Sequence, residues 1–187
     1  MEEIVIMDTK RFFARNDLDK KLKGLMEKAA EGDGDSQFSV ANQILEIVKN
    51  PSSKLYLLWM EESCRNGCVM AQYLLAETKD RSDRLDYYRM LVDNEKTPRQ
   101  VYDYSLLILA EDLYAKKDEK AVGLYEKVLE DDPRNKKACY RLAELYLNLG
   151  RIDDARKMFR LYQKLHKATM NHDYSDPLNL KEKLKKN

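Results

Sequence analysis

Four segments of the chain share one pattern, in which a small residue and a polar or variable residue precede apolar or aromatic residues and a closing alanine. The closing alanines are Ala41, Ala76, Ala110 and Ala143, so successive segments lie 35, 34 and 33 residues apart. A period of about 34 residues is typical of solenoids built from paired helices. The repeat therefore predicts an all-α fold of tandem antiparallel helix pairs, with about four pairs over residues 20–167.

The composition agrees with helices whose outer faces are solvated. Charged residues make up 36% of the chain, whereas it has only 6 glycines and 4 prolines. Lys and Arg nearly balance Asp and Glu, which leaves a net charge of +1. A chain with this balance has no overall field that attracts nucleic acid or an acidic membrane. We therefore expect neither as a partner.

Each unit has the pattern of two amphipathic helices separated by a turn. In the last unit, Leu142 and Tyr146 share a helical face, because residues four apart are neighbours on a helix. Gly150 then ends the helix, since glycine adopts the left-handed conformation that many helix ends require. Ala155 and Phe159 begin the apolar stripe of a second helix. The small closing alanine lets the two helices of a unit approach closely.

The second half of the chain, from Leu106 to Leu165, resembles the tetratricopeptide repeat. The first half resembles the related Sel1-like repeat, through a Lys-Ala-Ala-Glu-Gly run at 28–32 and through Ser36-Gln37-Phe38 and Ala71-Gln72-Tyr73. The resemblance implies a right-handed solenoid. The residues at the tetratricopeptide signature places are Ala121, Tyr125, Pro133, Leu142, Ala143, Tyr146, Gly150, Ala155 and Phe159.

The ends of the chain differ from its middle, as the ends of a solenoid must, because a terminal repeat has to present a polar face to water. We predict one domain over residues 1–187, with an N-terminal cap at 1–19 and a C-terminal tail and capping helix at 168–187. Asp176-Pro177 has the pattern of a helix start. Leu178, Leu180 and Leu184 would then pack against the last repeat.

Chemical sites are sparse in the sequence. His166 and His172 lie in no metal-binding spacing. Cys64, Cys68 and Cys139 offer too few donors for a zinc site and fit better as small buried apolar residues. We therefore expect no catalytic residue, no metal and no cofactor, and we interpret the chain as a non-enzyme. An odd cysteine count without a framework spacing favours a reducing, cytoplasmic location, and no segment has the length of a signal peptide or a membrane span.

The expected partner-binding surface is the concave groove that the first helix of each pair lines in related repeats. Aromatic residues and arginine are typical of interaction hot spots. The alternative for each residue is that its side chain covers a neighbouring helix. The residues transferred to the groove are Phe38 and Asn42, then Tyr73 and Glu77, then Tyr104, Glu111 and Tyr114, and finally Lys137, Tyr140, Arg141, Glu144 and Asn148.

Some tetratricopeptide domains bind a chaperone's C-terminal carboxylate with basic and amide side chains from successive first helices. Lys137 and Arg141 match the last helix of such a clamp, but Glu77 would repel a carboxylate, so we reject that function. The sequence favours a scaffold or adaptor that binds a peptide or protein segment in the groove. The alternatives are a chaperone or peptide-responsive regulator, and a self-associating module that forms a homodimer.

Overall fold

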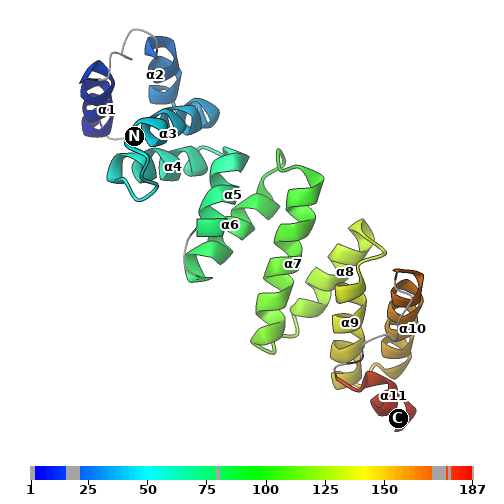
Figure 1. Cartoon of the computed structure of the whole chain (residues 1–187). Helices are drawn as coiled ribbons and strands as arrows, with labels where there is room; N and C mark the ends of the chain where they lie inside the picture. Colours follow the sequence, from blue (N-terminus) through cyan, green and yellow to red (C-terminus); the bar gives the residue numbers. More distant parts are fainter. Residues whose placement is uncertain (1–2, 16–21, 79–80, 170–175, 177, 187) are drawn as a thin grey trace. The chain divides into compact units, whose positions relative to one another are not determined.

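The computed structural model describes residues 3–15, 22–78, 81–169, 176 and 178–186, which form helices and no strand (Figure 1). The helices pack in successive pairs, which confirms the all-α fold predicted from the repeat. The chain divides into an N-terminal unit, Met1–Thr97, and a C-terminal unit, Pro98–Asn187. The assignment of residues 1–187 to one domain stays a prediction. The helices are α1 Glu3–Arg15, α2 Lys23–Ala30, α3 Gly34–Val48, α4 Lys54–Arg65, α5 Val69–Thr78, α6 Arg81–Asp93, α7 Arg99–Ala115, α8 Ala121–Asp131, α9 Lys136–Asn148, α10 Ile152–Thr169 and α11 Leu180–Lys186.

The N-terminal unit contains the pairs α3–α4 and α5–α6, and α2 packs against α3. The closing alanines Ala41 and Ala76 are fully buried, as expected for residues that let helices approach closely. The first helix, α1, packs on α4. Its Thr9 hydroxyl accepts a hydrogen bond of 2.7 Å from the buried Trp59 indole, so a polar contact and not apolar packing alone holds α1 in place.

A buried glutamine has the same hydrogen-bonding role in two successive repeats of this unit. The Gln37 side chain donates to the carbonyl of Ala29 at 2.9 Å, and Gln72 donates to the carbonyl of Cys64 at 3.2 Å. Both glutamines and both acceptors are separated by 35 residues. This shared arrangement shows that the glutamine of the small-Gln-aromatic motif is structural.

An asparagine completes each of these two arrangements. The Asn66 amide donates to the Gln37 side-chain oxygen at 2.9 Å, and the Asn94 amide donates to the Gln72 side-chain oxygen at 3.0 Å. Each buried glutamine therefore has both a donor and an acceptor partner, as a buried amide requires. The asparagine thus connects the first helix of each pair to the turn that follows the second helix of the same pair, α3 to the turn after α4 and α5 to the turn after α6.

The C-terminal unit contains the pairs α7–α8 and α9–α10, with Ala110 and Ala143 fully buried at their contacts. The turn after α9 contains Gly150 at φ 72, as predicted. Lys117 takes the equivalent place 33 residues earlier, with φ 57. A lysine with positive φ is unusual, so the α7–α8 turn keeps the same backbone shape without its glycine.

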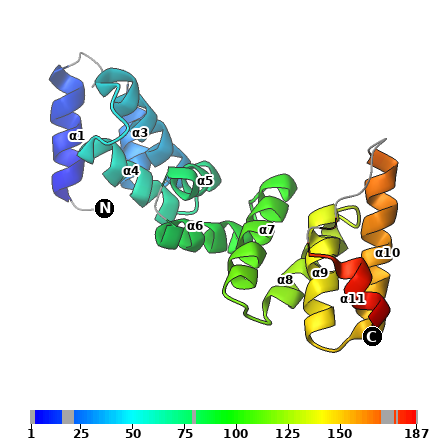
Figure 2. The ribbon, with the colours of Figure 1, turned by 60° about the horizontal axis from the view of Figure 1, so that its bottom comes forward.

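The last helix, α11, packs against α9 and α10 (Figure 2). It begins at Leu180, later than the Asp176-Pro177 start expected from sequence, and Pro177 lies outside the described residues. The Asp176 carboxylate accepts hydrogen bonds from the amides of Leu180 and Lys181 at 2.8 and 2.9 Å. Asp176 therefore caps the helix from outside it. Leu180 and Leu184 are buried, as expected.

Candidate partner-binding surface

Six side chains from α7, α8 and α9 of the C-terminal unit form one connected polar group. We call this group the Glu111 cluster. It joins the first helix of one pair, α7, to the first helix of the next, α9. Its members are Glu111, Tyr114, Tyr125, Lys137, Arg141 and Glu144.

Glu111 is the centre of the cluster. It accepts a hydrogen bond from the Tyr125 hydroxyl on α8, within its own helix pair. From α9 it meets the Lys137 ammonium at 3.0 Å and the Arg141 Nε at 3.2 Å. Burial alone would raise the pKa of the Glu111 carboxyl, but the hydrogen bonds from these three side chains outweigh burial and lower that pKa. The carboxylate is therefore ionised and fully partnered at neutral pH.

Arg141 is held on three sides. Its guanidinium carbon lies 4.1 Å from the centre of the Tyr114 ring, a cation–π distance. It faces Glu111 on one side and lies 3.9 Å from the Glu144 carboxylate on another. The Tyr114 hydroxyl in turn donates to Glu144. Burial and that hydrogen bond raise the pKa of Tyr114 to about 12, so Tyr114 stays a neutral donor.

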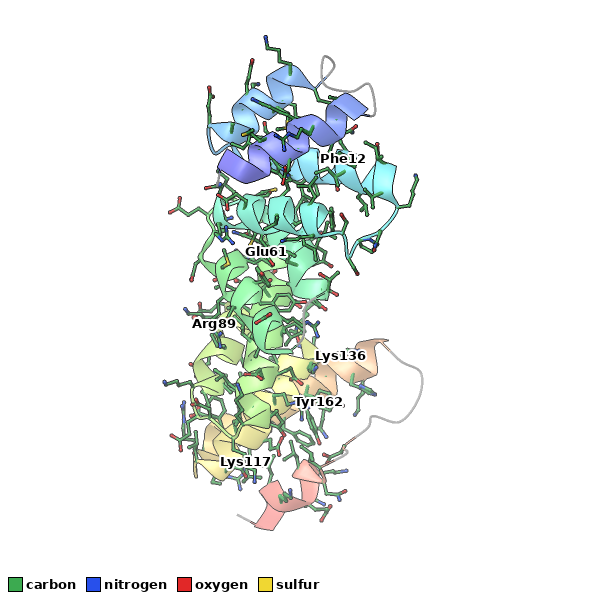
Figure 3. The ribbon with its side chains drawn as sticks, turned by 90° about the vertical axis from the view of Figure 1, so that its left-hand side faces the viewer. Phe12, Glu61, Arg89, Lys117, Lys136 and Tyr162 are labelled. Carbon is green, nitrogen blue, oxygen red and sulfur yellow. The ribbon has the colours of Figure 1, made fainter. Side chains whose placement is uncertain are left out.

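A hollow of about 530 Å³ lies next to the cluster, between the end of α7 and the end of α9. Its apolar part is made by Leu145 and Leu149, and Leu149 is 40% exposed. Lys117, labelled in Figure 3, lies at its rim in the α7–α8 turn. The lining of the hollow thus combines apolar, charged and aromatic side chains. Its lining is Tyr114, Ala115, Lys117, Glu119, Glu144, Leu145, Asn148 and Leu149.

Of the groove residues predicted in the C-terminal unit, the structure brings together Glu111, Tyr114, Lys137, Arg141 and Glu144. Asn148 is exposed and lines the hollow. Tyr104 is 40% exposed on α7 and is not part of the cluster. The cluster therefore contains most of the site predicted for this half of the chain.

Tyr140 lies elsewhere. It is only 7% exposed, and its ring packs against Tyr162 and Phe159 with centroid distances of 4.9 and 6.4 Å. Its hydroxyl donates to Asp176 at 2.9 Å. The structure gives Tyr140 the alternative placement, in which an aromatic side chain covers a neighbouring helix. The cause is helical geometry, since consecutive residues project about 100° apart and Arg141 points toward the Glu111 cluster.

The groove residues predicted in the N-terminal unit do not form one connected group in the contacts that the structure describes. Phe38 is half-buried against the core of that unit, and Asn42 and Tyr73 are also half-buried. Glu77 is exposed and accepts a hydrogen bond from the Tyr88 hydroxyl on α6. These residues belong to a different unit from the cluster, so a groove that runs through all four repeats stays a prediction.

Sequence reasoning missed the tyrosine partners of the glutamates. The resemblance gives Tyr125 only as a signature residue of the repeat, but its hydroxyl also joins the Glu111 cluster. A signal was present: Glu77, Glu111 and Glu144 each follow a closing alanine directly. A charged residue that recurs at one place of a repeat, beside the most buried position, indicates a recurring partner.

Among the described residues, the cysteines and the histidine do not form a metal-binding group. Cys64, Cys68 and Cys139 are free and buried. Burial raises the pKa of Cys64 to about 12 and that of Cys139 to about 11, so neither is a thiolate at neutral pH. Within the described ranges no group of His, Cys, Asp and Glu could hold a metal ion. His166 lies 5.6 Å from the Tyr162 ring centre, and His172 falls outside the described residues.

The helices between residues 3 and 186 that the structure describes include none long and apolar enough to cross a membrane. The cytoplasmic location expected from the cysteine usage stays a prediction.

In the C-terminal unit, side chains of the two first helices, α7 and α9, join one helix pair to the next. A family model described as "Tetratricopeptide repeat" matches residues 113–168. These residues, which include all of α9, most of α10 and five of the six members of the Glu111 cluster, are similar to the tetratricopeptide repeat. The Sel1-like character of the first half stays a prediction.

Tetratricopeptide repeats generally mediate protein–protein interactions, and their fold is generally a non-catalytic scaffold. Among solved structures, "Crystal structure of MamA protein" is similar, with 17% sequence identity and a TM-score of 0.46. The match covers 92% of this chain and 97% of that chain. No curated protein matches the sequence.

Proposed function

We propose that this chain is a non-catalytic scaffold that binds a segment of a protein partner, and that the face formed by α7 and α9 holds that segment. The observation that carries the proposal is the Glu111 cluster beside an open hollow. The cluster fixes aromatic and cationic side chains on two successive first helices. Side chains of this kind dominate the energetics of protein interfaces.

The cluster is preorganised for binding. Arg141 already lies against Tyr114 and between two carboxylates. A partner that contacts it therefore does not have to order a flexible side chain, which would otherwise cost about 0.5–1.5 kcal/mol. The neighbouring hollow lies within the roughly 300–1,000 Å³ range of ligand pockets, large enough for a side chain of the partner.

The charges of the cluster argue against a partner that binds through a free carboxylate of its own. Glu111 already meets both Lys137 and Arg141, so an incoming carboxylate would have to displace it. We expect instead a partner segment with an apolar side chain that enters the hollow and packs against Leu145 and Leu149. Polar groups of that segment would lie near Asn148 and Lys117.

Site-specific crosslinking tests the proposal. A photoreactive benzophenone amino acid placed at Asn148, in the hollow, should crosslink to a partner that the same group at Lys127 on α8 does not reach. Both positions are exposed, so they differ mainly in their surroundings. Equal crosslinking from both positions would contradict the assigned face.

The partner identified in this way is then purified and its affinity measured. Arg141→Ala should weaken binding by about 2 kcal/mol or more, roughly thirtyfold, as expected for a hot-spot residue. Lys127→Ala should leave the affinity unchanged. Light scattering of the free protein at several concentrations comes first, because a stable dimer that covers Asn148 would favour self-association over a partner.

A further inference from the structure

The α9–α10 pair has a second surface, which α11 covers. The two leucines of α11, Leu180 and Leu184, are 0% and 6% exposed, and the helix packs on both α9 and α10 (Figure 2). Leucines four residues apart lie on one helical face. Lys181, Glu182 and Lys183 face solvent. The covered surface therefore accepts one apolar face of a short amphipathic helix.

Tyr140 is the polar anchor of this contact. Its hydroxyl donates to the Asp176 carboxylate at 2.9 Å and accepts from the Leu178 amide at 2.8 Å. The same carboxylate caps α11. At the other end of the helix, the Arg156 guanidinium donates to the Leu184 carbonyl at 3.3 Å. The surface thus recognises an acidic cap, two leucines and a helix C-terminus.

Aromatic rings lie beside the anchor. The Tyr140 ring contacts Tyr162 and Phe159, and the latter two rings lie 6.1 Å apart in a stacked arrangement. Tyr162 is labelled on α10 in Figure 3. Clusters of this kind, with large rings and a hydroxyl that needs a partner, are typical of interaction hot spots. Tyr140 therefore connects an aromatic cluster to the segment that covers it.

The covering helix is weakly held compared with the repeats. It has seven residues, and an isolated helix shorter than about 12 residues is marginal in water. It buries two leucines, whereas α9 buries six residues in its pair. Elements with few buried apolar contacts open at lower free energy than the core of a domain. Opening of α11 therefore precedes unfolding of the repeats.

We propose that the α9–α10 surface under α11 is a docking site for a short amphipathic helix of a partner protein, and that α11 occupies this site in cis until the partner helix displaces it. The partner helix has the chemistry of α11, namely an acidic cap followed by two leucines four residues apart. This site lies on a different face of α9 from the Glu111 cluster, and it stands independently of the function proposed for that cluster.

A peptide with the sequence of residues 176–186 is the probe. In the full chain, Lys183→Pro should release α11, because the Lys183 amide donates to the Asn179 carbonyl and proline removes that donor. Lys183→Ala is the matched control, since it keeps the helix. The peptide can bind only molecules in which α11 is open, so its apparent affinity is reduced in proportion to the open fraction. We expect the Lys183→Pro chain to bind the labelled peptide about tenfold or more tightly than the Lys183→Ala chain.

A second variant, Leu180→Ala with Leu184→Ala, removes the apolar contacts of α11 without proline and should also gain peptide binding. A peptide with both leucines replaced by alanine should not bind either chain. Circular dichroism verifies that the repeats stay folded in each variant.

Three results would overturn the proposal. Folded variants that show no gain in peptide binding would mean that the surface is not a docking site. Equal binding to wild-type protein would place the peptide elsewhere on the chain. A dimer of the Lys183→Pro chain that excludes the peptide would make a second copy, and not a partner helix, the occupant.

Discussion

The hydroxyl of Tyr125 donates a hydrogen bond to the carboxylate of Glu111 between the two helices of one pair. The same relationship joins Tyr88 to Glu77 in the α5–α6 pair. In the last pair Phe159 takes the place of Tyr125, 34 residues later, and has no hydroxyl. Glu144 there accepts from Tyr114 of the preceding first helix instead. Where the tyrosine hydroxyl is missing, the glutamate therefore accepts its hydrogen bond from the preceding helix pair and not from its own.

The first prediction concerns the pH dependence of stability. The folded protein lowers the pKa of Glu111 below its ordinary value of 4.5. Glu111 therefore stabilises the fold above the unfolded pKa, and this contribution is lost as pH falls through the folded pKa. Glu111→Gln should reduce the free energy of unfolding at pH 7 by about 1.5–3 kcal/mol. The difference from wild type should shrink below about pH 4.5, measured by urea unfolding at a series of pH values. Glu130→Gln, at an exposed position on α8, is the control and should leave the free energy of unfolding at pH 7 nearly unchanged.

The second prediction concerns the coupling between Tyr125 and Glu111. Tyr125→Phe keeps the buried ring and removes only the hydroxyl, so it should cost about 1–2 kcal/mol. In a double-mutant cycle with Glu111→Gln, the two changes should cost less together than their sum, with a coupling of about 0.5–3 kcal/mol. Tyr102→Phe is the matched control, because its hydroxyl makes no hydrogen bond within the described residues. Additive losses at Tyr125 and Glu111 would contradict a direct interaction.

The third prediction separates two neighbouring residues of α9. Tyr140→Ala should lower the free energy of unfolding by about 3–5 kcal/mol, since it removes a large buried ring. Arg141→Ala should cost less in stability, because its side chain is 25% exposed. A test of partner binding therefore needs Arg141→Ala alone, without Tyr140→Ala. Chemical denaturation of the two single variants checks the difference, and equal losses would show that the assignment of faces is wrong.

The fourth prediction concerns two helical glycines. A β-carbon on Gly34 would lie 2.7 Å from the backbone oxygen of Asn66, closer than such atoms approach. Gly34→Ala should therefore destabilise the N-terminal unit by about 1–3 kcal/mol. Gly24→Ala on α2 meets no atom within 4 Å and should stabilise the helix by up to about 1 kcal/mol. Opposite shifts in melting temperature are expected, and a neutral Gly34→Ala would contradict the close approach.

The fold was predictable because its signals are local and periodic. The spacing of Ala76, Ala110 and Ala143 sets the helix pairs, and Gly150 marks a turn that the structure confirms. The packing of the C-terminal cap was less predictable, since it includes a hydrogen bond from Tyr140 to Asp176, 36 residues later in the chain. No local pattern encodes that contact.

The candidate site was only partly predictable for a related reason. The resemblance to known repeats placed Glu111, Lys137 and Arg141 on the groove side of the first helices, and the structure brings these three side chains together. Their charges, however, neutralise one another across 26–30 residues of sequence, and spacing alone does not show this pairing. Tyr140 was misplaced because aromatic character fits both a groove and a core, and only its tertiary neighbours distinguish them.

The hydrogen bond from Asn66 to Gln37 has a consequence for how the protein ages. Asn66 is followed by Gly67, and an asparagine before glycine deamidates readily, because glycine does not hinder attack of its amide on the side chain. Deamidation would turn a donor into a carboxylate that faces the Gln37 oxygen. Two acceptors would then oppose each other, and the link from α3 to the next turn would be lost. A molecule in which Asn66 has deamidated would therefore lack the hydrogen bond that connects α3 to the turn after α4.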